Sequence, residues 1–181
     1  MDARPISDDE AAVWLRRAEP GDELAVAAVH VRSWQVAYRG LLPEDYLHDL
    51  RPEDRASRYT FGERGRGGPR TVLAIDGVRV VGFATTGPAR DDDSPGWGEL
   101  YALYVHPDGW GRGTGRALML DARERLAGEG FSAVLLWVLV GNQRAQRFYR
   151  IDGWSPDGSR RREEEVHGVP IDETRYRRSL S

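Results

Sequence analysis

The chain has 181 residues, 40% of them hydrophobic and 30% charged, and its formal net charge is −3. These values fit a single globular domain over residues 1–181, and they give no reason to expect a nucleic-acid-binding face. No run approaches the roughly 18 apolar residues of a membrane helix. The absence of cysteine excludes disulfides, thiolate metal sites and a cysteine nucleophile.

Two further features bear on location and metals. The four histidines show no metal-ligand spacing, so we expect no metal. The acidic first residues lack the basic and apolar regions of a signal peptide. We therefore expect a cytoplasmic protein with no membrane partner.

The first half of the chain predicts one strand and three helices. Alternation over residues 12–18 predicts a strand. Pro20-Gly21-Asp22 supplies a turn and a cap for a helix over residues 23–38. Two shorter helices begin near Pro43 and Pro52, each with acids in its first turn. Residues 62–70, rich in glycine and arginine, are predicted to form a loop.

The second half predicts a hairpin and then alternating strands and helices. Residues 71–75 and 78–86 are β-rich and are joined by Asp76-Gly77, a strong two-residue turn signal. After a polar loop over residues 87–96 come a strand to Val105, a helix over 113–129 and an apolar strand over 131–140. A helix over residues 142–150 and two polar strands, 160–166 and 172–178, complete the order. We expect an α/β (α+β) fold: a mixed, mostly antiparallel central sheet of six to seven strands flanked by helices on both faces.

The segment Gly98 to Leu118 is the most informative part of the chain. An apolar strand passes through His106-Pro107 into a glycine-rich turn, and an amphipathic helix follows at once. Such a turn lets backbone amides approach a phosphate, and the helix N-terminus adds partial positive charge. The segment therefore predicts a phosphate-binding loop.

Several explanations for this loop can be compared. A P-loop requires lysine, and the chain has none, because all 26 of its basic residues are arginine. A dinucleotide fold places its glycines near the first strand and an acid about 20 residues later, and neither feature is found here. The glycines can also simply make a tight strand-to-helix connection, although three in five residues exceed what a turn needs.

The remaining explanation is a resemblance to the GNAT superfamily of N-acetyltransferases. That family has a strand ending in V-x-P and then the pattern [QR]-x-x-G-x-[GA]. The corresponding residues here are Val105-His106-Pro107 and Trp110-Gly111-Arg112-Gly113-Thr114-Gly115, with Trp110 where glutamine or arginine is usual. Residues 142–149, NQRAQRFY, followed by Gly153-Trp154, resemble the family's N-x-x-A-x-x-F-Y-x-x-x-G-[FW] element. Residues 31–43 resemble one branch of the superfamily, so the likeness spans nearly the whole chain.

The resemblance implies a GNAT-like acyl-CoA N-acyltransferase fold and binding of acetyl-CoA as cosubstrate. It assigns the cofactor to Leu103 and Val105 on the strand, to Gly111, Arg112, Gly113, Thr114, Gly115 and Arg116 in the loop, and to Asn142. The loop amides are expected at the pyrophosphate, with Arg112 or Arg116 adding charge. Arg116 can equally be a solvated helix residue, and Asn142 can also serve as a helix cap.

The resemblance also implies transfer of an acetyl group to a primary amine of a small molecule or peptide. Without a cysteine, direct transfer in a ternary complex is expected. Tyr149 stands at the family's general-acid position, and Glu99 is the candidate general base, or else a binder of a cationic acceptor. Trp34 and Tyr38, with His30 nearby, are expected at the acceptor site or in the core.

Two points stay open at this stage. The alternative function is a non-catalytic acyl-CoA-binding regulatory domain on the same fold, because the loop serves both roles. The two polar C-terminal strands could pair across a homodimer.

Overall fold

The computed structural model describes residues 4–5, 13–62, 68–164 and 168–180. In chain order its elements are β1 (Arg4–Pro5), β2 (Trp14–Arg17), α1 (Glu23–Ala37), α2 (Glu44–Asp49), α3 (Pro52–Ala56), β3 (Arg70–Asp76), β4 (Arg79–Pro88), β5 (Gly98–Val105), the 3-10 turn η1 (Pro107–Gly109), α4 (Thr114–Gly128), β6 (Ala133–Leu139), α5 (Gln143–Ile151), β7 (Ser155–Glu164) and β8 (Pro170–Ser179). Parts of the predicted first strand, the loop over residues 62–70 and the strand over residues 160–166 lie outside the described residues.

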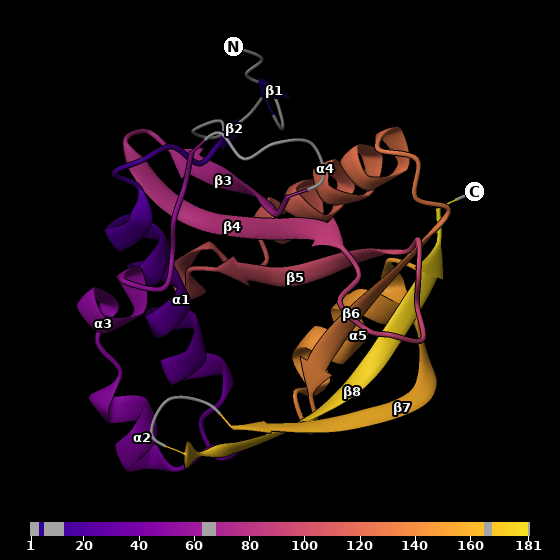
Figure 1. Cartoon of the computed structure of the whole chain (residues 1–181). Helices are drawn as coiled ribbons and strands as arrows, with labels where there is room; N and C mark the ends of the chain where they lie inside the picture. Colours follow the sequence, from indigo (N-terminus) through magenta and orange to yellow (C-terminus); the bar gives the residue numbers. More distant parts are fainter. Residues whose placement is uncertain (1–3, 6–12, 63–67, 165–167, 181) are drawn as a thin grey trace.

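The strands of the described residues form one sheet in the order β1-β2-β3-β4-β5-β6-β8-β7 (Figure 1). Only β5 and β6 are parallel neighbours, and every other pair is antiparallel. The predicted mixed, mostly antiparallel sheet is thus confirmed, with the two-residue β1 as an eighth strand. No helix of the described residues is long and apolar enough to cross a membrane.

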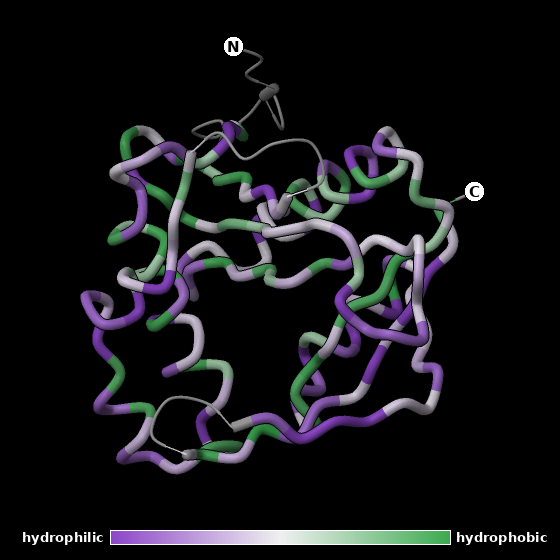
Figure 2. Tube along the Cα trace, in the orientation of Figure 1, coloured by the Kyte–Doolittle hydropathy of each residue, from purple (hydrophilic) through white to green (hydrophobic). Residues whose placement is uncertain are grey.

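Helices cover both faces of this sheet, as the alternation along β3 requires. Val72 and Ala74 pack in one core cluster with Leu118 of α4, whereas Leu73 packs on the opposite face with Val26 of α1. This is the period of two expected when both faces of a strand are buried. Figure 2 shows hydrophobic residues along the central strands and a largely hydrophilic β7–β8 edge.

Three local predictions differ from the structure. The strand predicted from residue 160 begins five residues earlier, because β7 runs from Ser155 and pairs with β8 from there. The β3–β4 turn is made by Gly77-Val78 rather than Asp76-Gly77, because Asp76 already pairs with Arg79. Gly77 supplies the positive φ (+58°) at the first turn position. Asp22 precedes α1 as predicted, but its carboxylate does not cap the helix. It accepts instead from Arg16 Nη1 at 2.6 Å and from the Glu19 amide at 2.8 Å.

The feature that creates the site is a separation of the two parallel strands. β5 and β6 pair only from Gly98–Val134 to Leu100–Leu136. Beyond this point β5 stays paired with β4, and β6 stays paired with β8. The sheet therefore opens between the C-terminal halves of β5 and β6, and both strands present unshared edges to the opening.

Candidate active site

A cavity of about 970 Å³ occupies the opening between β5 and β6. Residues 99–105 of β5 form one wall, and residues 137–139 of β6 with the start of α5 form the other. The glycine loop lies at one end, and the loop before β5 contributes at the other. The volume lies within the range of about 300–1,000 Å³ that small-molecule sites occupy.

The glycine loop presents free backbone amides to this cavity. Gly113 is the N-cap of α4 with φ +84°, and no side chain caps the helix. The first turn of α4 also carries no acidic residue, so its partial positive charge is not compensated. Gly111, Gly113, Gly115 and Arg116 line the cavity. These features suit an anion such as a pyrophosphate.

The side chains of two predicted loop residues do not line the cavity. The Thr114 side chain is buried, at 2% exposure, and Arg112 is exposed. Neither is among the residues that line the cavity. The position of a side chain does not decide where its backbone amide points, so the assignment of these two amides to the pyrophosphate stays a prediction.

The end of β5 is held by two hydrogen bonds to a single carbonyl. The Val105 oxygen accepts from Ser33 Oγ at 2.9 Å and from the Trp110 indole N–H at 2.7 Å. Leu103 and Val105 both line the cavity as predicted. The Val105 carbonyl is therefore part of the scaffold that ties α1 and the glycine loop to the strand.

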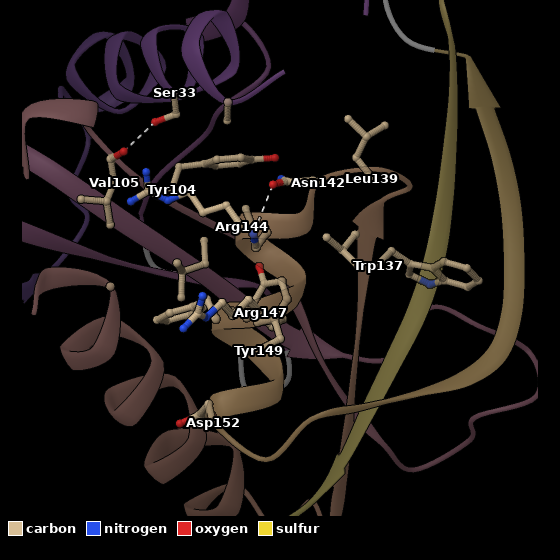
Figure 3. A pocket seen from close by; sticks show the side chains of 18 of the residues that line it. Ser33, Tyr104, Val105, Trp137, Leu139, Asn142, Arg144, Arg147, Tyr149 and Asp152 are labelled. Atoms are coloured by element: carbon tan, nitrogen blue, oxygen red, sulfur yellow. Dashed lines mark hydrogen bonds between the residues drawn. The ribbon is translucent and has the colours of Figure 1, made fainter. Parts of the chain in front are cut away.

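Asn142 and Tyr149 bring α5 to the opposite wall (Figure 3). Asn142 Oδ1 accepts from the Ala145 amide at 3.1 Å, which confirms the predicted cap. The Tyr149 ring is buried among Phe148, Trp154 and Tyr176. Burial raises the pKa of the Tyr149 hydroxyl, so the phenol keeps its proton at neutral pH.

Glu99 is almost fully buried at the other end of the cavity, with 1% exposure. Its Oε2 accepts from the Arg90 amide at 3.0 Å and from Arg90 Nε at 3.2 Å, and its Oε1 accepts from Arg90 Nη2 at 2.6 Å. The Arg90 guanidinium also lies 4.3 Å from the Tyr101 ring centroid. Three of about four lone-pair positions on the carboxylate are thus in use.

A second carboxylate, not singled out from the sequence, lines the same cavity. Glu173 lies opposite Leu139 in the β6–β8 ladder, and its Oε2 accepts from Arg161 Nε at 2.7 Å. Arg161 in turn lies 4.4 Å from the Trp137 ring centroid. In the sequence, Glu173 and Arg175 are two residues apart on the last predicted strand, which places both on one face of it. Nothing in the local sequence indicates that this face of the strand meets the cavity.

The two aromatic residues predicted for the acceptor site or the core, Trp34 and Tyr38, differ in whether they line the cavity. Tyr38 lines the cavity, and burial raises the pKa of its hydroxyl. Trp34 does not line it. It packs between Tyr38 and His30, with the Arg55 guanidinium 5.1 Å from its ring centroid. Trp34 and Tyr38 lie one helical turn apart and belong to the same core cluster, and of the two only Tyr38 reaches the cavity.

Comparisons with known proteins agree with this geometry. Residues 30–154 match the model of the acetyltransferase (GNAT) family. The chain is 33% identical over 162 residues to the uncharacterized N-acetyltransferase YuaI of Bacillus subtilis, covering 89% of this chain and 90% of the relative. It is 36% identical over 125 residues to a mycothiol acetyltransferase of Mycobacteroides abscessus, covering 68% of this chain but 38% of that longer protein.

A solved structure gives the same picture of the fold. The PaiA N-acetyltransferase of Thermoplasma acidophilum, in complex with coenzyme A, superposes with a TM-score of 0.66 at 20% identity. The match covers 89% of this chain and 97% of that one.

Proposed function

Because the chain belongs to the GNAT family of acetyltransferases, we propose that it moves an acetyl group from acetyl-CoA directly to a primary amine of a small molecule or peptide. The chain is an acetyl-CoA-dependent acetyltransferase. The proposal adds the acceptor class and direct transfer. The observation that carries it is one cavity that joins open loop amides, a protonated tyrosine and two carboxylates.

The residues of the cavity fit coenzyme A. The uncapped amides at the start of α4, Thr114 to Arg116, suit the pyrophosphate. The unshared edge of β5 at Leu103 suits an extended amide-containing arm. Asn142, 9% exposed, reaches the same space from α5. Bound acetyl-CoA supplies the thioester whose carbonyl carbon the amine attacks.

Tyr149 is proposed as the general acid. Its hydroxyl faces the cavity from α5, and burial keeps it protonated (Figure 3). A thiolate leaving group requires a proton, and a phenol held in a dry wall can donate one without a competing base.

A carboxylate must handle the proton that the amine loses. A free alkyl amine has a pKa near ~10 and is protonated at neutral pH. Glu99 is proposed to take this proton through a water molecule, with Arg90 holding the carboxylate in one orientation. Glu173 is the second candidate, because it lines the same cavity from β8.

The test is thiol release from acetyl-CoA with a panel of amines that includes polyamines, amino acids, aminoglycosides and peptides. We expect at least one amine to be acetylated, and Tyr149→Phe to lower kcat about 100-fold or more, with CoA affinity preserved. Coenzyme A binding with no acetyl transfer to any amine would contradict the proposed function. Unchanged kcat in Tyr149→Phe at every accessible pH would remove Tyr149 from the mechanism.

A further inference from the structure

Trp110 stands where the family pattern has glutamine or arginine, and the structure shows what the indole does there. Its N–H donates to the Val105 carbonyl at 2.7 Å, which fixes the ring against the end of β5. The face of the same ring contacts Arg144, whose guanidinium carbon lies 3.5 Å from the ring centroid. The substituted position is therefore a fixed platform for a cation from another element.

Arg144 differs from those arginines of the cavity that hold a carboxylate. Arg90 and Arg161 each hold a carboxylate, at 2.6 and 2.7 Å respectively. Among the described residues, Arg144 makes no ion pair, and its guanidinium lies on the Trp110 ring. Arg116 and Arg147 also line the cavity without an ion pair in the described part of the chain, but the ring contact is found at Arg144. Partial burial lowers the pKa of Arg144, with no carboxylate nearby to offset that effect.

The position of Arg144 brings this uncompensated charge to the anion-binding end of the cavity. It lies two residues after the Asn142 cap, and its side chain reaches from the start of α5 toward Val105 (Figure 3). Trp110 directly precedes Gly111 in the loop, and both residues line the cavity with Arg144. A guanidinium on an aromatic platform retains its donors at the edge, where a phosphate can accept two of them.

We propose that Arg144, held on the Trp110 ring, binds the pyrophosphate of coenzyme A and adds a side-chain contact to those of the loop amides. The proposal rests on the proposed function for the identity of the ligand. It assigns Arg144 to binding and Trp110 to positioning.

The test is calorimetric titration, without any acceptor amine, of coenzyme A, 3′-dephospho-coenzyme A and pantetheine. We expect Arg144→Gln to weaken coenzyme A and 3′-dephospho-coenzyme A by the same factor, about 10- to 100-fold, and to leave pantetheine binding unchanged. Arg150→Gln is the matched control, because Arg150 lies on the same helix, does not line the cavity and bonds Gln146. That variant should bind all three ligands as the wild type does.

A double-mutant cycle tests the platform. Trp110→Ala should weaken coenzyme A binding, and adding it to Arg144→Gln should cause little further loss, because Trp110 acts through Arg144. Trp110→Phe retains a ring and should retain most of the affinity, which separates the platform from a general folding defect.

Three results would overturn the proposal. A loss confined to coenzyme A would place Arg144 at the 3′-phosphate, and an equal loss for pantetheine would indicate a structural role. Unchanged affinity for every ligand would leave Arg144 as a solvated residue. Because no acceptor is present, these outcomes are independent of whether any amine is acetylated.

Discussion

At the scale of single residues, His30 is held neutral by its two partners. Arg55 Nη2 lies 3.0 Å from His30 Nε2, and an arginine can only donate, so Nε2 accepts. The proton of the neutral ring is then on Nδ1, 2.6 Å from the Tyr59 hydroxyl. The ring also stacks on Tyr104, with centroids 4.5 Å apart. His30 is therefore a core residue that joins α1 to the strands, and it does not line the cavity.

This geometry predicts acid-dependent stability. Burial, followed by the charges of Arg55 and Arg58, lowers the pKa of His30 well below its ordinary value of 6.5. The unfolded chain therefore binds a proton near pH 6.5 that the folded chain does not bind. The free energy of unfolding should fall as pH is lowered through and below 6.5, by at most about 1.4 kcal/mol per pH unit from this residue.

Urea unfolding of His30→Gln between pH 5 and 8 measures this effect. The variant should lose part of the wild-type pH slope, whereas His48→Gln, at an exposed position on α2, should keep it. Equal slopes in His30→Gln and the wild type would contradict the assignment.

The two carboxylates of the cavity give a second prediction at this scale. If Glu99 takes the amine proton, Glu99→Gln should lower kcat/KM about 100-fold at pH 7 and recover toward pH 10, where free amine is abundant. Glu173→Gln should then retain the wild-type profile, and Glu129→Gln, distant from the cavity, serves as control. A wild-type pH profile in Glu99→Gln together with a changed one in Glu173→Gln would transfer the role to Glu173.

At the scale of elements, α4 has a different requirement at each end. Gly113 precedes the helix with φ +84°, and nothing lies within 4 Å of the position where a Cβ would be. Its constraint is therefore conformational and not steric. Gly128 ends the same helix without a positive φ, also with open space around it.

Replacing each of these two glycines by alanine should change the free energy of unfolding in opposite directions. Gly113→Ala should lower the free energy of unfolding by about 1–2 kcal/mol, the cost of a left-handed alanine, and should weaken coenzyme A binding. Gly128→Ala should raise it by about 0.5–1 kcal/mol and leave binding unchanged. Thermal unfolding with and without coenzyme A measures both effects, and stabilisation by Gly113→Ala would refute the helix-cap geometry.

At the scale of the whole molecule, Arg175 joins three segments that are distant in sequence. Its guanidinium on β8 contacts Asp91 at 2.9 Å, Asp93 at 2.6 Å and Asp157 at 2.8 Å. Asp91 and Asp93 belong to the loop that carries Arg90, and Asp157 belongs to β7. Asp91 and Asp93 thus tie the polar loop over residues 87–96 to β8, at the end of the cavity where Arg90 and Glu99 lie.

Removing this tie should lower the stability of the fold and raise KM for the acceptor amine. Arg175→Met leaves two partly buried carboxylates without their cation and should cost about 3 kcal/mol of folding free energy. It should also raise KM for the amine more than KM for acetyl-CoA. Asp92→Asn changes an exposed carboxylate in the same loop and should stay within about 0.5 kcal/mol of the wild type. Equal stability of the two variants in urea would contradict this role.

Local patterns were sufficient for much of the fold. The glycine loop, the Asn142 cap and the β3–β4 hairpin depend on backbone conformation and on side-chain preferences within a few residues, and all three are found as predicted. The family assignment, confirmed by the comparisons, also depends on such short patterns. The β-turn was displaced by one residue because strand register is decided by pairing along the whole ladder.

The sequence by itself thus determined most of the elements, the family and the glycine-rich loop whose Trp110 departs from the family pattern. Only the tertiary structure decided which side chains meet around that loop. The opening between β5 and β6 depends on where their pairing stops. The Glu173–Arg161 pair and the Arg144–Trp110 contact each join residues from different elements. Such contacts depend on how elements pack and twist, and the spacing of residues within one segment carries no information about them.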